Sequence, residues 1–129
     1  MSKYLTKILG NDLESLRMIA ALSSGAKVKV SNIKYLALNK VFLLSVERMN
    51  KEKQQHDEKI NSILRFDFIS TVKSKNIDQS KQEKILVLLS IDHLKNVDDY
   101  EITLTFNNNA QIVLSSDTLE FRLEDQSNI

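Results

Sequence analysis

The amino-acid sequence predicts an α+β protein that is mostly β, with an antiparallel sheet or partly open barrel of seven to eight strands and one N-terminal helix. Two observations carry this prediction. Apolar and polar residues alternate through the last third of the chain, whereas one segment near the N-terminus has helical spacing instead. Alternation with period two places one face of a strand on a core, and a period near 3.6 marks an amphipathic helix.

The alternation is clearest in three segments near the C-terminus. Residues 100–106 read YEITLTF, residues 111–115 read QIVLS and residues 119–124 read LEFRLE. The short connections between these segments favour antiparallel pairing. We therefore expect three consecutive strands here, of which the last covers Leu119–Leu123.

The helix is expected after Gly10. Asn11 with Glu14 three residues later resembles a capping box, so we expect Asn11 to cap the helix. Helical spacing then relates a group of apolar residues, namely Leu13, Leu16, Ile19, Ala20 and Leu22. Ser23–Gly25 should end the helix, and its single apolar stripe should cover a face of the sheet.

Strand patterning continues through the middle of the chain. We expect strands from Lys27 to Val30, over Ile33–Leu38 and over Val41–Arg48, with Asn39–Lys40 as a two-residue hairpin turn. The run 50–59 has no apolar side chain and is expected to be a solvated hairpin tip or loop.

One long strand is expected over Ile60–Ser74, with one face formed by Leu64, Phe66, Phe68 and Val72. Lys84–Leu94 is apolar on both faces, as is typical of a central strand. Residues 1–129 should form a single domain. By strand count the nearest common fold is a pleckstrin-homology-like barrel, although its helix lies at the other end of the chain.

Composition narrows the classes of partner. The net charge of +1 argues against a nucleic-acid-binding protein, which is usually strongly basic. Lys27, Lys29 and Lys34 cluster near Tyr35, but a single-stranded RNA surface would need several aromatic side chains facing outward. The absence of cysteine fits a reducing compartment. With no signal-peptide pattern and no apolar run of membrane-spanning length, we expect a cytoplasmic protein.

No catalytic, cofactor-binding or metal-binding motif is recognisable. The histidines are His56, in the polar run, and His93, beside Asp92, and neither has the spacing of a zinc motif. With only two glycines, the chain cannot form a nucleophile elbow or a glycine-rich phosphate loop. A hydrolase would require Asp67, Asp92 or His93 to converge in a closed pocket. We therefore predict no catalytic residues, no metal and no cofactor.

Two non-catalytic functions are favoured over the third alternative, a hydrolase with an unrecognised site. The first is a non-enzymatic protein-binding or scaffolding module, which can also self-associate as a homodimer through an exposed strand edge, Ile33–Leu38 or Leu119–Leu123. The second is a barrel that binds a small ligand or lipid head group at its mouth. For that site the candidate polar contacts are Arg65, Asp67 and Lys73, because Arg65 and Asp67 share one face of a predicted strand.

Several segments carry a resemblance to a known family. Residues 28–44 read VKVSNIKYLALNKVFLL, residues 64–77 read LRFDFISTVKSKNI and residues 84–91 read KILVLLSI. With ITLTF and LEFRLED downstream, the chain resembles a family of small alphaproteobacterial proteins classed as a domain of unknown function. It departs from that pattern by lacking tryptophan near the 50–59 run and in the C-terminal tail. The resemblance implies the fold and no catalytic residues.

Overall fold

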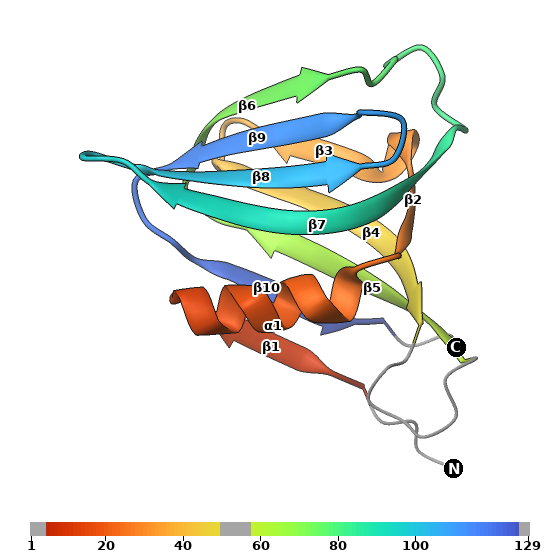
Figure 1. Ribbon diagram of the computed structural model, residues 1–129, viewed down its shortest axis with the longest axis horizontal. Coiled ribbons are helices and arrows are strands. Elements are labelled where there is room, and N and C mark those ends of the chain that lie inside the picture. Colours follow the sequence, from red (N-terminus) through yellow and green to blue (C-terminus); the bar gives the residue numbers. More distant parts are fainter. Residues whose placement is uncertain (1–4, 50–57, 127–129) are drawn as a thin grey trace.

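The computed structural model describes residues 5–49 and 58–126, which form one α-helix, a short 3-10 turn and ten strands. Figure 1 shows the helix lying across one side of a strongly curved sheet. The elements in chain order are β1 (Lys7–Gly10), α1 (Leu13–Ser23), β2 (Lys27–Lys29), η1 (Val30–Asn32), β3 (Ile33–Leu36), β4 (Val41–Met49), β5 (Lys59–Phe66), β6 (Ile69–Lys75), β7 (Ile85–Lys95), β8 (Tyr100–Phe106), β9 (Gln111–Ser116) and β10 (Phe121–Asp125).

The ten strands belong to one antiparallel sheet that does not close into a barrel. Neighbouring strands follow the order β1-β10-β5-β4-β2-β7-β8-β9-β6, and β3 pairs with β4 beside this path. The α+β, mostly β fold class is confirmed. The predicted count of seven to eight strands was too low, because Lys7–Gly10 also pairs as a strand and the expected strand over Ile60–Ser74 is two strands.

The break within Ile60–Ser74 corrects the predicted facing of Phe68. Phe68 has a φ of +59°, in the left-handed region that bulky residues rarely adopt. The chain therefore turns sharply between β5 and β6, and it is Ile69 that is buried. Phe68 is 49% exposed and does not continue the core face of Leu64 and Phe66.

The helix begins one residue later than predicted. Asp12, not Asn11, is the N-cap, because the Ser15 backbone N–H donates to an Asp12 carboxylate oxygen at 2.8 Å. This hydrogen bond lowers the pKa of Asp12. At the other end Gly25 has a φ of +88°, which a glycine adopts without steric cost. The chain can therefore turn directly from α1 into β2.

The first hairpin also has a longer loop than predicted. The strands end at Leu36 and resume at Val41, so four residues, 37–40, connect them instead of the two residues Asn39–Lys40. Lys40 has a φ of +56°, and the Asn39 backbone N–H donates to the Leu36 carbonyl at 3.1 Å. The polar run 50–59 falls largely outside the described residues.

Buried apolar side chains from the helix and from most strands of the sheet form one core. Leu16 and Ile19 of α1 pack into it, as the helical spacing predicted. Burying one such side chain contributes about 1.5–3 kcal/mol. Three tilted phenylalanine rings extend along the inner face of neighbouring strands, namely Phe42, Phe66 and Phe121. Over residues 5–49 and 58–126, no helix has the length and apolar character needed to cross a membrane.

The two predicted strand edges have different outcomes. Leu119–Leu123 was wrong as an edge, because β10 lies between β1 and β5 and pairs with both. The segment Ile33–Leu38 contains β3, whose only strand partner in the described part of the chain is β4. One side of β3 is therefore an edge, as predicted.

Candidate functional site

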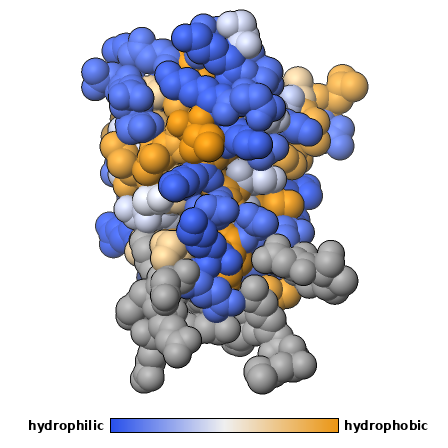
Figure 2. Space-filling view, turned by 90° about the vertical axis from the view of Figure 1, so that its right-hand side faces the viewer, coloured by the Kyte–Doolittle hydropathy of each residue, from blue (hydrophilic) through white to orange (hydrophobic). Residues whose placement is uncertain are grey.

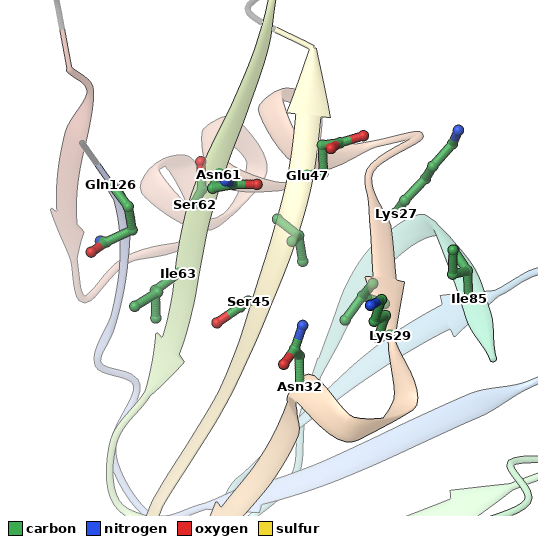
Figure 3. A pocket seen from close by; sticks show the side chains of 12 residues that line it. Lys27, Lys29, Asn32, Ser45, Glu47, Asn61, Ser62, Ile63, Ile85 and Gln126 are labelled. Carbon is green, nitrogen blue, oxygen red and sulfur yellow. The ribbon is translucent and has the colours of Figure 1, made fainter. Parts of the chain in front are cut away.

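A groove lies where β2 separates from β4. β2 pairs with β4 at Lys27 opposite Glu47 and otherwise follows β7. The turn η1 then brings the chain back, so that Ile33 lies opposite Leu44. The intervening part of β4 has no strand neighbour on this side, and a hollow of about 450 Å³ forms there (Figure 3).

Both polar and apolar residues line the groove. Its lining includes the polar residues Lys27, Lys29, Asn32, Ser45, Glu47, Asn61 and Gln126, together with Val28, Val46, Ile63 and Ile85. Figure 3 shows Asn32 rising from η1 into the space between β4 and β2, while Lys27 extends outward at the rim. Figure 2 shows the side of the molecule that carries β2, where hydrophilic residues surround smaller hydrophobic areas.

The ion pairs leave the groove positively charged. Glu47, the one acidic residue among the lining side chains, pairs with Lys59 at 3.8 Å. Lys29 pairs with the exposed Glu83 at 3.3 Å. Lys27 forms no ion pair within the described residues.

A second candidate surface lies at the end of β3. We call Leu36, Leu38 and Phe68 the apolar corner, because each is an exposed large apolar side chain. The Tyr35 hydroxyl donates to the Ile69 carbonyl at 2.7 Å, and the Ile69 backbone N–H donates to the Lys40 carbonyl at 2.8 Å. These bonds hold the β5–β6 bend against the β3–β4 loop. They place the bend that contains Phe68 close to the β3–β4 loop.

Of the predicted ligand contacts, the structure joins Arg65 and Asp67. The Arg65 Nε–H donates to Asp67 Oδ1 at 2.9 Å, and Arg65 Nη2 forms an ion pair with the same oxygen at 2.9 Å. Lys73 lies exposed on β6, the last strand of the sheet, and no hydrogen bond or ion pair joins it to Arg65 or Asp67 among the described residues. The three residues therefore do not form a common site in this structure.

The other candidate residues are dispersed. Asp67 and His93 line separate hollows, and Asp92 accepts a hydrogen bond from Ser90 at 3.2 Å. His56 lies outside the described residues. Over residues 5–49 and 58–126, no three His, Cys, Asp or Glu residues cluster as a metal site would require. Tyr35 faces the core and donates to Ile69, so it does not form a stacking surface beside the nearby lysines.

A buried ion pair was missed by the sequence analysis. Arg48 is 1% exposed, and its Nη2 donates to both oxygens of Asp125 at 3.0 Å. Ser62 Oγ donates to Asp125 Oδ1 at 2.6 Å, and the Thr6 backbone N–H donates to Asp125 Oδ2 at 2.8 Å. The sequence did contain a signal for this burial, because strand alternation places Arg48 on the same buried face of β4 as Phe42.

This network joins four segments of the chain. Its members come from β4, β5, the end of β10 and the residue before β1. A buried charge is tolerated when its hydrogen-bonding capacity is satisfied by such partners. The network is enclosed, so its role is to hold both ends of the described chain against the β4–β5 hairpin.

No curated protein and no solved structure matches this chain. One family model does match, over residues 6–129, and its description is "Protein of unknown function (DUF2948)". The match spans all ten strands and the helix. The chain therefore belongs to the DUF2948 family of proteins of unknown function.

Proposed function

We propose that this protein is a non-enzymatic protein-binding module that takes up an extended acidic segment of a partner along the free edge of β3. The observation that carries the proposal is the combination of an unpaired strand edge with the apolar corner at its end. A strand edge offers a row of backbone donors and acceptors, and an incoming strand can pair with them. The apolar corner supplies a contact for apolar side chains of that strand.

Charge supports an acidic segment. Lys34 lies exposed on β3 and Lys40 lies exposed in the following loop. Neither lysine forms an ion pair within the described part of the chain. Lysines on an edge strand discourage pairing with a second basic strand, whereas acidic side chains opposite them would be attracted. For the same reason, pairing of β3 with the β3 of a second copy is the less favourable alternative.

The test uses two designed peptides on the full chain. One alternates Val with Glu and the other alternates Val with Lys, and both have blocked ends. We expect the acidic peptide alone to shift the backbone amide resonances of β3 and the β3–β4 loop in a saturable manner. Amide shifts confined to another part of the sheet, or equal binding of both peptides, would contradict the proposal.

A matched pair of variants tests the apolar corner. Leu38→Asp should abolish peptide binding, since it places a carboxylate where an apolar contact is proposed. Val97→Asp is the control, because Val97 is also a fully exposed apolar residue but lies in the β7–β8 turn. Light scattering across a dilution series tests whether the protein forms a homodimer. If the protein is a dimer that dissociates in Leu38→Asp but not in Val97→Asp, a second copy of the chain, and not an acidic partner, occupies the edge of β3.

The cytoplasm remains the compartment we propose, on the basis of the cysteine-free sequence. Fractionation of the native cell with an antibody to the protein would test it, and recovery outside the cytoplasmic fraction would contradict it.

A further inference from the structure

We infer that the outward face of the β7-β8-β9-β6 part of the sheet binds a second copy of this chain, face to face, about a two-fold axis that runs along the strands between β8 and β9. The register of the strands, the exposure of the face and the placement of its charges support this dimer. The face is separate from the free edge of β3, so the inference does not depend on the acidic partner proposed above.

Side chains of these four strands form a regular grid on the outward face. Three rows cross the strands, and members of a row lie opposite one another on neighbouring strands. In the order β7, β8, β9 and β6, the rows are Leu94, Glu101, Ser115 and Thr71; then Asp92, Thr103, Val113 and Lys73; then Ser90, Thr105, Gln111 and Lys75. Along β8 and β9 the residues between grid positions are buried, so alternation directs the grid away from the core.

No helix or strand in the described part of the chain covers this face. Figure 1 shows the four strands side by side in the foreground, with β3 and β4 behind them. The helix instead packs Leu16 and Ile19 into the core. Every residue of the grid is half-buried or exposed in the single chain. The face is therefore open to a partner, as one face of an antiparallel sheet often is.

The charges of the middle row lie at opposite edges of the face. Asp92 is exposed on β7 and Lys73 is exposed on β6. Thr103 and Val113 separate them, so the two charged residues are three strand spacings, or about 14 Å, apart. Neither forms an ion pair within residues 5–49 and 58–126. The carboxylate and the ammonium group of one chain therefore cannot satisfy each other.

A two-fold axis along the strands makes this arrangement self-complementary. Rotation about it places β7 of one copy over β6 of the other, and β8 over β9, within the same row. Asp92 of each copy then meets Lys73 of the other copy, and the contact occurs twice, as in any isologous interface. Lys75 on β6 and Glu101 on β8 add to the same separation of charge.

The same separation of charge favours a second copy over other partners. A partner with charges of one sign would meet like charge at one edge of the face, whereas a second copy presents both signs in matching order. At the centre, Thr103 and Thr105 of one copy would lie over Val113 and Gln111 of the other. These side chains can pack without burying an unpaired charge, and their polarity favours a reversible dimer over an obligate one.

Sedimentation equilibrium of the full chain across a dilution series tests the dimer. Asp92→Lys should raise the dimer Kd about tenfold to a hundredfold, because the two-fold axis turns two attractions into two repulsions. Lys73→Asp should raise it similarly, since it brings carboxylates together at both edges. The unaltered dimer should also weaken as salt is added, because exposed charges are screened.

Mixing the two weakened variants provides a rescue. In an equal mixture of Asp92→Lys and Lys73→Asp, cations of one chain face carboxylates of the other at both edges, so a heterodimer should form. A chain that carries both substitutions should likewise regain the Kd of the unaltered protein. Damage to the fold could not be reversed in either way.

Matched controls reverse the same charges at exposed positions outside the face. Asp98→Lys lies in the β7–β8 turn and Lys34→Asp lies on β3, and both should leave the dimer Kd unchanged. Lys34→Asp also removes a cation beside the free edge of β3, so it should weaken binding of the acidic peptide without affecting the dimer. The two proposals can therefore fail independently.

Three results would overturn the inference. The first is a chain that stays monomeric up to about 1 mM. The second is a dimer that the control variants weaken as much as Asp92→Lys and Lys73→Asp do. The third is the absence of rescue both in the mixture and in the doubly substituted chain, which would place the interface elsewhere on the molecule.

Discussion

The two ends of the β4–β5 pair differ in how far their side chains and backbone groups are buried and bonded within the protein. At one end Arg48, Ser62 and Asp125 form an enclosed network that also binds the backbone of Thr6. At the other end Leu36, Leu38 and Phe68 remain exposed beside an unpaired strand edge. The first end contributes stability and offers nothing to a partner. The second end leaves apolar surface and backbone groups available, which is what an interaction surface requires.

The largest expected effect is loss of the enclosed network. Arg48→Ala leaves the Asp125 carboxylate buried without its cation, and it should lower the free energy of unfolding by about 3–5 kcal/mol. Urea unfolding followed by circular dichroism measures this change. The double variant Arg48→Met with Asp125→Leu removes both charges and should be markedly more stable than Arg48→Ala. If the two unfold alike, the ion pair does not hold this end of the sheet in the way described.

The next effect tests the close contact of β1 with the helix. A Cβ added at Gly10 would lie 2.4 Å from Ser15 Cβ and 2.8 Å from a ring carbon of Phe121. Gly10→Ala should therefore lower the free energy of unfolding by about 1–3 kcal/mol through overpacking. Gly25→Ala provides a comparison, because a Cβ at Gly25 meets no atom within 4 Å and only the positive φ opposes it. Adding Ser15→Gly should recover stability in Gly10→Ala and not in Gly25→Ala.

A smaller effect of opposite sign is expected at the apolar corner. Phe68 holds a left-handed backbone conformation that asparagine adopts more readily. Phe68→Asn should therefore raise the free energy of unfolding by about 0.5–1 kcal/mol, while weakening binding of the acidic peptide. Phe68→Ala is the control, since alanine keeps the strained conformation and should bring no gain. A destabilised Phe68→Asn variant would show that the Phe68 ring contributes packing instead of an interaction surface.

The smallest effect is expected at Asp12, the N-cap of α1, which belongs to neither end of the β4–β5 pair. The hydrogen bond from the Ser15 backbone lowers the pKa of Asp12, so the charged cap favours the folded state. That contribution is present above the ordinary pKa of an aspartate and disappears as the pH falls through the lowered value. Asp12→Ala should thus lower the melting temperature near neutral pH and less so in acid. A difference in melting temperature that does not depend on pH would contradict the role of the charge.

Much of the sheet followed from local patterning. Alternation located β8, β9 and β10 within one or two residues, and helical spacing placed Leu16 and Ile19 of α1 in the core. Such patterns succeed because burial of one face is recorded residue by residue along the chain. They do not record which strand lies alongside, so β10 was expected at an edge although it has two neighbours.

The candidate sites were harder to predict from the sequence than the strands were. Arg65 and Asp67 were expected on one face and do form an ion pair, because they lie two residues apart. The groove depends on β2 leaving β4 for β7, a choice between partners distant in sequence. That Lys27, Lys29 and Asn32 line one groove could not be recognised before that path was known.

The sequence by itself determined the α+β class, the helix, most strand positions and the identity of most core side chains. Only the tertiary structure decided the bend at Phe68, the burial of Arg48 and the opening beside β4. No glycine or proline marks the bend, and the partner of Arg48 is Asp125, 77 residues away. The physical reason is that alternation encodes burial locally, whereas strained backbone, buried charge and open space are stable only through contacts made between distant segments.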